Sequence, residues 1–570
     1  MTVRNLDRVF KPASVALIGA SRTPRSVGAV LARNLLRAGF EGPIMPVNPK
    51  YSAIEGVLAY ADVASLPVVP DLAVISTPPE AVPRLVAELG AKGTKAAVVI
   101  TAGFGEGGEG GGKALQRAML EAARPHLLRI VGPNCLGVMV PGRRLNASFA
   151  HLAPLEGGIA FVAQSGALLV SVLDWATSRG IGFSYMVSLG DMADVDFGDM
   201  LDYLAGDAGT RAILLYIEAV TNARKFMSAA RAAARVKPVV VVKAGRHAEG
   251  ARAATSHTGA LAGDDAVYDA AFRRAGLLRV LDMEELFDAV ETLATANPPK
   301  GDRLAIVTNG GGVGVLATDA LIDAGGRLAE LSAGTVARLD RVLPPTWSHG
   351  NPVDIIGDAS GKRYADALGA VLEDEGVDAV LVLNCPTAVA SSAEAAEAVS
   401  GVLDGRATSA FTSWLGDGTA AAARRLFAER RVPTYPTPSQ AVRAFMHMVR
   451  YGRAQDQLME TPPSLPEFRI DRAAARAEIA RALDDGRELL TEPEAKAVLE
   501  AYGVPVVPTR AAPNAEDAAA AAREFAAPVA LKILSPDITH KSDVGGVELD
   551  LAPDAVAAAA LAMAARVARA

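Results

Sequence analysis

The sequence predicts an α/β protein made of several domains, each with a parallel sheet covered by helices. Short apolar runs alternate with helical patterns along most of the chain, which is typical of parallel strands joined by helices. An apolar strand, a glycine-containing turn and a helix follow one another near residues 19, 164 and 309, about 145 residues apart. A chain of 570 residues is too long for one core, and about four domains are expected.

The composition excludes several classes of protein. A net charge of −7 and a pI of about 5.7 argue against a general nucleic-acid-binding surface. Two cysteines, Cys135 and Cys385, cannot form a disulfide framework or a cysteine-rich zinc site, and they fit a reducing cytosol. The N-terminus has no continuous apolar signal core, and no uncharged apolar run reaches the ~18 residues of a membrane span. We expect a cytoplasmic protein that binds neither nucleic acid nor membranes.

The first unit, residues 1–140, begins with a predicted strand over 15–19, a turn and a predicted helix over 29–38. A phosphate or nucleotide can bind where such a turn meets a helix N-terminus, but the GxGxxG spacing is missing, so a plain turn is an equal alternative. Later strands, near 43–47, 72–76 and 96–101, end in polar residues at the edge where open α/β sheets bind ligands. The candidate binding residues in these turns are Gly19, Ala20, Ser21, Arg22, Lys50, Ser76, Thr77, Pro78 and Thr101. For Lys50, a solvated surface position is the alternative.

The second unit, residues 150–298, repeats the pattern. A predicted strand over 159–162 leads into Gln164, Ser165 and Gly166, and a helix over 168–178 follows. The start of that helix offers free N–H groups and the positive end of its dipole. Glu218 directly follows the predicted strand 212–217 and therefore lies at the same edge, where a buried carboxylate needs a partner. An ordinary exposed glutamate is the alternative.

The most distinctive loop of this unit spans residues 243–263, with His257 among glycine, alanine, serine and threonine. Small residues let the backbone approach a ligand closely. An imidazole there can act as a base, a metal ligand or a phosphoryl acceptor, and the alternative is a loop histidine without a chemical role. The remaining histidines outside the C-terminal loop have no such setting, and we assign them structural or surface positions: His126, His151, His247, His349 and His447.

A third unit, residues 300–455, has a strand over 304–307 that meets the turn 308–314. This is not a Walker A loop, because no Gly-Lys-Ser/Thr follows. A second polar strand end, residues 384–387, completes the edge. Residues 456–487 are charged and contain several prolines, which predicts a linker.

The last unit, residues 488–570, begins with a helix that Thr491 caps. Two strands are predicted over 529–534 and 547–549, and the first carries Lys532. The polar loop between them contains His540, and an alanine-rich helix ends the sequence. This unit is expected to be the beginning of a longer domain, because it is too short to enclose a nucleotide.

Five motifs together resemble the NDP-forming acyl-CoA synthetases, which are the acetate–CoA ligases (ADP-forming) and relatives of succinyl-CoA synthetase. They occur in the family's order and span nearly the whole chain: VALIGAS at 15–21, GPNCLG at 132–137, QSG at 164–166, SHTGALAG at 256–263 and LKILSPDITHKSDVGG at 531–546. The resemblance implies a Rossmann-like CoA-binding domain, two flavodoxin-like domains of which the first carries a phosphorylatable histidine, and the N-terminal part of an ATP-grasp domain.

The resemblance also implies residue roles. Acyl-CoA and phosphate would give acyl phosphate, which phosphorylates His257, and the phosphohistidine would then pass its phosphoryl group to ADP. Glu218 would hold the imidazole, His540 would help to relay the group, and Lys532 would contact nucleotide phosphates. Asn134 joins the CoA-binding residues, and the phosphate and substrate residues are Gln164, Ser165, Gly166, Gly190, Asn309, Gly310 and Thr387.

A phosphohistidine is a dianion, and two helix N-termini would supply its donors. One is the helix after Gly166. The other is expected in the third unit, either after residues 309–311 or at residues 386–387. By resemblance we place a phosphate contact at Asn309 and the helix start at residues 386–387.

The expected ligands are a small carboxylic acid, CoA, ATP or ADP, and Mg²⁺ with its ligands beyond residue 570. We expect a homo-oligomer. The domain order also resembles the synthetase-like part of bacterial protein lysine acetyltransferases, in which an acetyltransferase domain would follow residue 570. The alternative function is therefore a CoA- or acyl-CoA-sensing module without catalysis. A dinucleotide-binding dehydrogenase, with NAD at Gly19, is a weaker alternative, and the sequence does not specify the acyl group.

Overall fold

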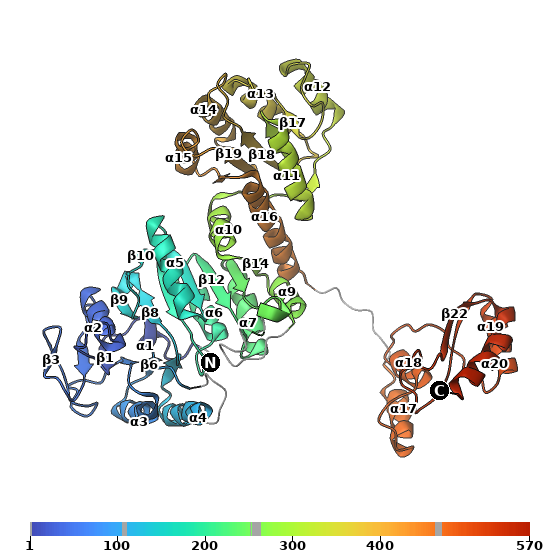
Figure 1. The fold of residues 1–570 in the computed structure, drawn as a ribbon, viewed down its shortest axis with the longest axis horizontal. Helices are drawn as coiled ribbons and strands as arrows, with labels where there is room; N and C mark the ends of the chain where they lie inside the picture. Colours follow the sequence, from blue (N-terminus) through green and yellow to red (C-terminus); the bar gives the residue numbers. More distant parts are fainter. Residues whose placement is uncertain (1–2, 105–110, 251, 253–263, 462–469, 570) are drawn as a thin grey trace. The chain divides into compact units, whose positions relative to one another are not determined.

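The computed structural model describes residues 3–104, 111–250, 252, 264–461 and 470–569. The chain forms two compact units, Met1–Glu460 and Thr461–Ala570, which we describe separately (Figure 1). The motif at 256–263, with His257, lies outside the described residues. Among the residues that are described, none forms a helix long and apolar enough to cross a membrane.

The first sheet is a parallel sheet of five strands in the order β2-β1-β5-β6-β7. Every residue of β1, β5 and β6 is buried, because helices cover both faces, as the continuous apolar runs predicted. The strands are β1 (Val15–Ile18), β2 (Ile44–Val47), β5 (Leu72–Ile75), β6 (Ala96–Val99) and β7 (Arg129–Val131), beside the small hairpin β3 (Ala53–Ile54) and β4 (Val57–Leu58). The helices are α1 (Asp7–Phe10), α2 (Val27–Arg37), η1 (Pro79–Ala81), α3 (Val82–Lys92), α4 (Gly112–Ala123) and η2 (Arg124–His126).

The second sheet has seven strands in the order β14-β13-β12-β10-β11-β8-β9. Five of them are parallel, and the hairpin β8–β9 pairs antiparallel with β11. The strands are β8 (Gly137–Val140), β9 (Leu145–Ser148), β10 (Leu155–Ala163), β11 (Gly182–Ser188), β12 (Ala212–Ile217), β13 (Val239–Lys243) and β14 (Leu278–Val280). The helices are η3 (Pro141–Arg143), α5 (Gly166–Ser178), α6 (Phe197–Ala205), α7 (Ala223–Ala234), α9 (Asp265–Arg274) and α10 (Met283–Thr295).

The first two sheets are held together by a shared core and by buried charges. One cluster of buried side chains contains both Leu17 of β1 and Val241 of β13. Arg129 of β7 lies 2.9 Å from the Asp194 carboxylate and 3.2 Å from that of Asp199. Such contacts fix the carboxyl edges of the two sheets relative to each other, which a site built from both sheets would require.

The third sheet is entirely parallel, in the order β16-β15-β18-β19-β20, and β17 pairs with β15. Its strands are β15 (Arg303–Thr308), β16 (Arg327–Leu328), β17 (Val353–Asp354), β18 (Ala379–Asn384), β19 (Ala410–Trp414) and β20 (Thr434–Tyr435). Its helices are α11 (Gly311–Asp323), α12 (Ala333–Val342), α13 (Gly361–Leu372), α14 (Ser392–Leu403), α15 (Ala421–Glu429) and α16 (Pro438–Met459). The long helix α16 buries Phe445 and packs against α10 and α11.

The C-terminal unit contains α17 (Arg472–Asp484), α18 (Glu492–Ala501), α19 (Ala515–Phe525), η4 (Pro553–Ala555), α20 (Val556–Val567) and an antiparallel pair, β21 (Val529–Lys532) and β22 (Val547–Leu551). Helix α17 lies within the predicted linker 456–487 and packs against α18, so that part of the prediction is corrected. Its sequence is rich in alanine and arginine, which favour helix, whereas charge and proline content alone pointed to a linker. Thr491 caps α18, as predicted.

Candidate functional site

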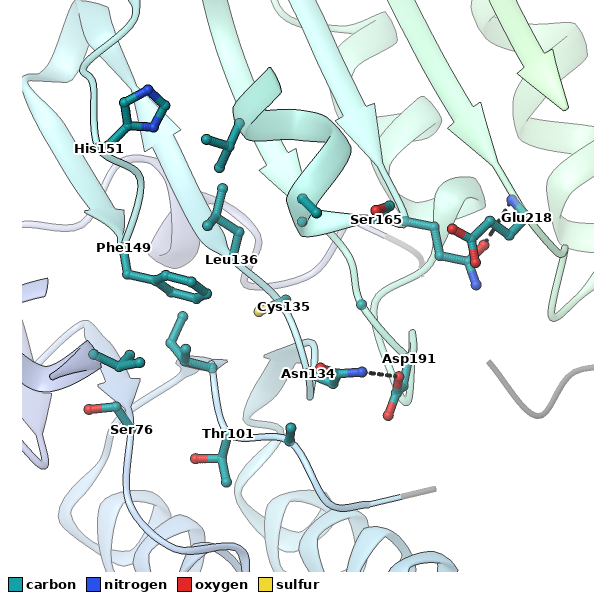
Figure 2. Close-up of a pocket in the computed structure, with 18 of the residues that line it drawn as sticks. Ser76, Thr101, Asn134, Cys135, Leu136, Phe149, His151, Ser165, Asp191 and Glu218 are labelled. Atoms are coloured by element: carbon teal, nitrogen blue, oxygen red, sulfur yellow. Dashed lines mark hydrogen bonds between the residues drawn. The ribbon is translucent and has the colours of Figure 1, made fainter. Parts of the chain in front are cut away.

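A cavity of about 790 Å³ lies between the carboxyl edges of the first two sheets (Figure 2). Most of the residues that line it follow strands β5, β6, β9, β10, β11 and β12 or belong to the segment between β7 and β8, and Val27 at the start of α2 also lines it. The cavity brings together nine predicted site residues: Ser76, Thr77, Thr101, Asn134, Gln164, Ser165, Gly166, Gly190 and Glu218. Parallel strands end at a common edge, and for that reason residues far apart in the sequence meet here.

The segment after β7, residues 132–137, forms one wall of the cavity. Asn134 has a φ of 54°, a left-handed conformation that asparagine tolerates, and its side-chain amide donates to Asp191 Oδ1 at 3.2 Å. Gly190 has a φ of 55°, and a Cβ added there would lie 2.2 Å from the Pro133 carbonyl oxygen. The turn at Gly190 therefore closes against this segment only because residue 190 has no side chain.

The N-terminus of α5 faces the same cavity. The Ser165 hydroxyl accepts from the Leu168 amide at 3.3 Å, and both Gly166 and Ala167 line the cavity. A Cβ at Gly166 would lie 3.1 Å from the Leu136 Cβ, so the helix start is packed closely against the neighbouring segment. The amides of a first helical turn and its positive dipole end form an anion site.

Glu218 is a buried carboxylate held by Gln164. The Gln164 Oε1 atom accepts from the amides of Glu218 at 3.1 Å and Ala219 at 3.0 Å. Gln164 and Glu218 are only 7% and 9% exposed, respectively. Burial, with a smaller contribution from the Glu218 charge, raises the pKa of Tyr216 above its ordinary value. The predicted substrate residue Gln164 thus fixes the backbone at Glu218 through its oxygen and keeps its NH₂ group as a donor.

The structure adds residues that the sequence analysis did not assign to a site. Cys135, Leu136, Phe149 and His151 also line the cavity, and Figure 2 shows His151 and Glu218 on opposite sides of the view. Cys135 donates through Sγ to the Val99 carbonyl at 3.3 Å, and burial raises the pKa of its thiol to about 12. The GPNCLG motif pointed to Cys135 and Leu136, whereas nothing in the spacing of Phe149 or His151 indicated a site.

The first glycine turn lies beside the cavity, although it does not line it. Gly19 has a φ of 91°, and a Cβ there would be 2.7 Å from the Ser76 carbonyl oxygen. Arg22 lies over the ring of Tyr51, 5.9 Å from its centroid. Pro78 precedes η1. The same sheet edge carries Ala20, Ser21 and Lys50. The side chain of Asn48 links them: its amide donates to the Ala20 carbonyl at 2.7 Å, and its oxygen accepts from the Lys50 backbone amide at 2.9 Å.

In the third sheet, the side chain of Asn309 is engaged in bridging two strand ends. It donates to the Cys385 carbonyl at 2.9 Å and accepts from the Cys385 amide at 2.8 Å. Helix α11 begins at Gly311 with Gly310 as its N-cap, and no described side chain caps it. Its first-turn amides are therefore less occupied than those of α14, which Ser391 caps.

The helix start predicted at residues 386–387 is wrong. Thr387 lies in a loop and donates to the Gly357 carbonyl at 3.0 Å. Helix α14 begins at Ser392, where the Ser391 hydroxyl accepts from the Glu394 amide at 3.2 Å. A serine N-cap directly before the helix decides its start, and that signal was available in the sequence.

In the C-terminal unit, Lys532 forms an ion pair with Glu492, with Nζ 3.0 and 3.1 Å from the two carboxylate oxygens. This contact, with that of Lys496, holds the pKa of Glu492 below its usual range. His540 is exposed in the loop between β21 and β22. Across the described residues, no group of three or more histidine, cysteine, aspartate or glutamate side chains is placed to hold a metal ion.

Comparison with known proteins assigns a family to each part of the chain. Residues 13–141 match a CoA binding domain, 156–293 a succinyl-CoA ligase like flavodoxin domain, 304–459 a ligase-CoA domain and 481–570 an ATP-grasp domain. These matches support the suspected family and its α/β domain types.

Two curated relatives are similar over most of the chain. The acetate–CoA ligase [ADP-forming] I of Archaeoglobus fulgidus is 41% identical over 96% of this chain and 78% of the relative. The 4-hydroxybutyrate–CoA ligase [ADP-forming] of Nitrosopumilus maritimus is 36% identical, with the same coverage.

A solved structure, the dinucleotide forming acetyl-coenzyme A synthetase 1 of Ca. Korarchaeum cryptofilum in complex with phosphate and ADP, aligns with a TM-score of 0.71 and 35% identity. The alignment covers 81% of this chain and 99% of that one. The fold of this chain is thus similar to that of a solved protein. The chain belongs to the NDP-forming acyl-CoA synthetases, the family of the ADP-forming acetate–CoA ligases.

Proposed function

We propose that this protein interconverts acyl-CoA, ADP and phosphate with a carboxylic acid, CoA and ATP, through an acyl phosphate and a phosphohistidine. The observation that carries the proposal is the cavity in which Ser76 and Thr101 of the CoA-binding side face Ser165 and Glu218 of the second sheet. A thioester entering from the first sheet would meet an anion site and a carboxylate in the same cavity.

In the first step, phosphate attacks the thioester carbonyl. A C–O bond forms, the C–S bond breaks, and the phosphate proton passes to the leaving thiolate, which gives acyl phosphate and CoA. The first-turn amides of α5 support this step because they can hold the phosphate beside the carbonyl. The thiol of Cys135 does not act as a nucleophile here, since burial raises its pKa to about 12.

In the second step, an imidazole nitrogen of His257 attacks the phosphorus atom and the carboxylic acid leaves as its carboxylate. His257 is outside the described residues, and its role rests on its motif. Glu218 would accept a hydrogen bond from the other ring nitrogen and stabilise the charge that develops on the ring. Its fixed backbone and burial suit a group that must orient an imidazole.

The third step would transfer the phosphoryl group from His257 to ADP. The proposed participants are Lys532, which would bind nucleotide phosphates, and His540, which would relay the group. Lys532 is already paired with Glu492, so nucleotide binding would have to compete with that carboxylate. Mg²⁺ commonly accompanies nucleotide phosphates, but the described residues include no cluster suited to it, and no step is assigned to it.

The proposed acyl substrate is a small carboxylic acid. The two relatives named above act on acetate and 4-hydroxybutyrate, which are both short acids. Leu136 and Phe149 give the cavity an apolar wall, which lies away from Glu218 in the view of Figure 2. A screen of short carboxylic acids for CoA ester formation would identify the preferred one.

Labelling with ³²P-acetyl phosphate, and separately with γ-³²P-ATP, tests this function. We expect an acid-labile, base-stable label that is lost in His257→Ala and released as acyl phosphate when a carboxylate is added. His126→Ala is the matched control, because this histidine lies in η2 and does not line the cavity. If neither donor labels the parent protein while CoA still binds, the ligase assignment is wrong and a CoA-sensing module without catalysis is favoured.

A further inference from the structure

Lys243 is a buried lysine at the carboxyl edge of the second sheet. Its relative exposure is 2%, and it is among the largest fully buried side chains of the described chain. It is the last residue of β13, beside Ile217, the last residue of β12, with which it is paired in register. Lysine is rarely buried without a partner, so the position of this ammonium needs a reason.

The contacts of the Lys243 ammonium connect two chain segments. Nζ donates to the carbonyl of Ala244, where the chain leaves β13, and lies 4.6 Å from the ring centroid of Tyr268 on α9. The Tyr268 hydroxyl in turn accepts from the Val220 amide at 3.3 Å, two residues after Glu218. One side chain thus joins the end of β13, helix α9 and the backbone that follows Glu218.

The charges around Lys243 come from three neighbouring elements. Asp265 lies in the first turn of α9, Arg279 on β14 and Glu218 after β12. Burial lowers the pKa of Lys243, the Asp265 and Glu218 carboxylates oppose that shift, and Arg279 adds to it. Arg279 is itself 2.5 Å from the Asp265 carboxylate and 3.3 Å from that of Asp269, so two carboxylates of α9 neutralise the charge of this arginine. Within the described residues, Lys243 has no such ion pair of its own, and its ammonium contacts the Ala244 carbonyl and the Tyr268 ring.

We propose that Lys243 is a positioning residue for phosphoryl transfer: through the ring of Tyr268, whose hydroxyl binds the Val220 amide, it fixes the backbone that carries Glu218 and so keeps the Glu218 carboxylate oriented. The inference rests on the proposed function, because Glu218 acts there as the partner of the imidazole. The ammonium is not a catalytic residue in this assignment, since it does not line the cavity. It acts on Glu218 through Tyr268 of α9, whose hydroxyl binds the Val220 amide.

The test measures phosphohistidine formation from ³²P-acetyl phosphate in Lys243→Met, Lys243→Arg and the parent. We expect the maximal labelling rate of Lys243→Met to fall at least about tenfold, with the KM for acetyl phosphate and the Kd for CoA within about twofold of the parent values. Lys243→Arg should recover most of the rate, because it restores the positive charge. A role limited to folding would lower the melting temperature together with the fraction of protein that binds CoA. The labelling rate per CoA-binding molecule would then stay at the parent value.

Lys237→Met is the matched control. Lys237 lies just before the amino end of β13, and its ammonium also donates to carbonyls, those of Leu204 and Asp207. Its loss should lower stability without slowing labelling. If Lys243→Met does not fold, Tyr268→Leu takes its place and should slow labelling about fivefold or more, since the residue that joins Lys243 to Val220 is removed.

Two results would overturn the inference directly: a labelling rate of Lys243→Met within about twofold of the parent rate, or a loss of labelling rate in Lys237→Met as large as that in Lys243→Met. If Lys243→Met does not fold, a normal labelling rate in Tyr268→Leu would overturn it as well. Each of these leaves the proposed function intact, because the parent is still labelled. An unlabelled parent would instead contradict the proposed function, and with it the role given to Lys243.

Discussion

The Gln164 side-chain oxygen accepts a hydrogen bond from the Glu218 backbone amide at 3.1 Å, across 54 residues of sequence. The two residues follow β10 and β12, which are neighbours in the second sheet. A second bond from the Ala219 amide completes the contact. The backbone that carries the buried Glu218 is therefore held by a side chain that follows the adjacent strand.

Gln164→Leu should test this relationship. The substitution leaves two buried amides without an acceptor, so we expect a loss of roughly 1–3 kcal/mol in the free energy of unfolding. His257 labelling by acetyl phosphate should slow as well, because Glu218 loses its fixed position. Chemical denaturation and the labelling assay measure the two effects. Gln457→Leu, at an exposed glutamine on α16, is the control, and equal losses in both variants would contradict the expectation.

Glu218→Gln should separate binding from chemistry. The amide keeps the size of the side chain but removes the charge that would stabilise the imidazole ring, so His257 labelling should fall about a hundredfold or more. CoA binding, measured by calorimetry, should stay within about twofold, since the change is neutral in volume. A normal labelling rate in this variant would remove Glu218 from the mechanism.

Gly190→Ala should disrupt the cavity. A methyl group there would lie 2.2 Å from the Pro133 carbonyl oxygen and 2.3 Å from that of Asn134, and backbone atoms cannot yield cheaply. Gly180→Ala is a close control, because its φ of 69° is also positive and the added Cβ would meet nothing within 4 Å. Both changes introduce backbone strain of roughly 1–2 kcal/mol. Only Gly190→Ala should also abolish CoA binding, and unchanged CoA affinity in that variant would show that the turn can shift.

The two cysteines should differ in reactivity. Cys135 is 3% exposed and burial raises the pKa of its thiol to about 12, whereas Cys385 is half-buried at the edge of the third sheet. At pH 8 the thiolate fraction of Cys135 would be on the order of 10⁻⁴. Iodoacetamide followed by peptide mass spectrometry should therefore modify Cys385 first, and unfolded protein should react at both. Rapid alkylation of Cys135 in the folded protein would mean that the cavity wall opens.

Asp288→Asn should stabilise the protein in a pH-dependent way. Burial, reinforced by Glu284 and Glu291, raises the pKa of Asp288 to about 6, so the folded protein favours its protonated form. The stabilising effect of that form is complete below pH 4 and is lost as the pH rises through about 6. At pH 7.5 the variant should gain roughly 1–2 kcal/mol, and near pH 4 almost nothing. Thermal melts at both values measure this, and a gain of equal size at the two would point to another cause.

Much of the fold and part of the site could be predicted from local patterns. The continuous apolar runs at 72–75 and 96–99 are buried parallel strands, as expected. The polar strand ends gave Ser76, Thr101, Gln164 and Glu218, which all line one cavity. The start of α14 at Ser392 and the helix α17 were missed because motif resemblance and proline content were given more weight than capping and helix propensity.

The sequence by itself determined the domain types, the edges at which ligands bind and the family, because periodicity, glycine turns and ordered motifs are properties of neighbouring residues. Only the tertiary structure decided how those edges meet. It placed Phe149 and His151 in the cavity wall, used the Gln164 oxygen to hold Glu218, and buried Lys243 under Tyr268. These contacts depend on strand order and on the packing of helices against the sheet. Both bring together residues that are far apart in the sequence, and the local sequence around such residues does not indicate the contact.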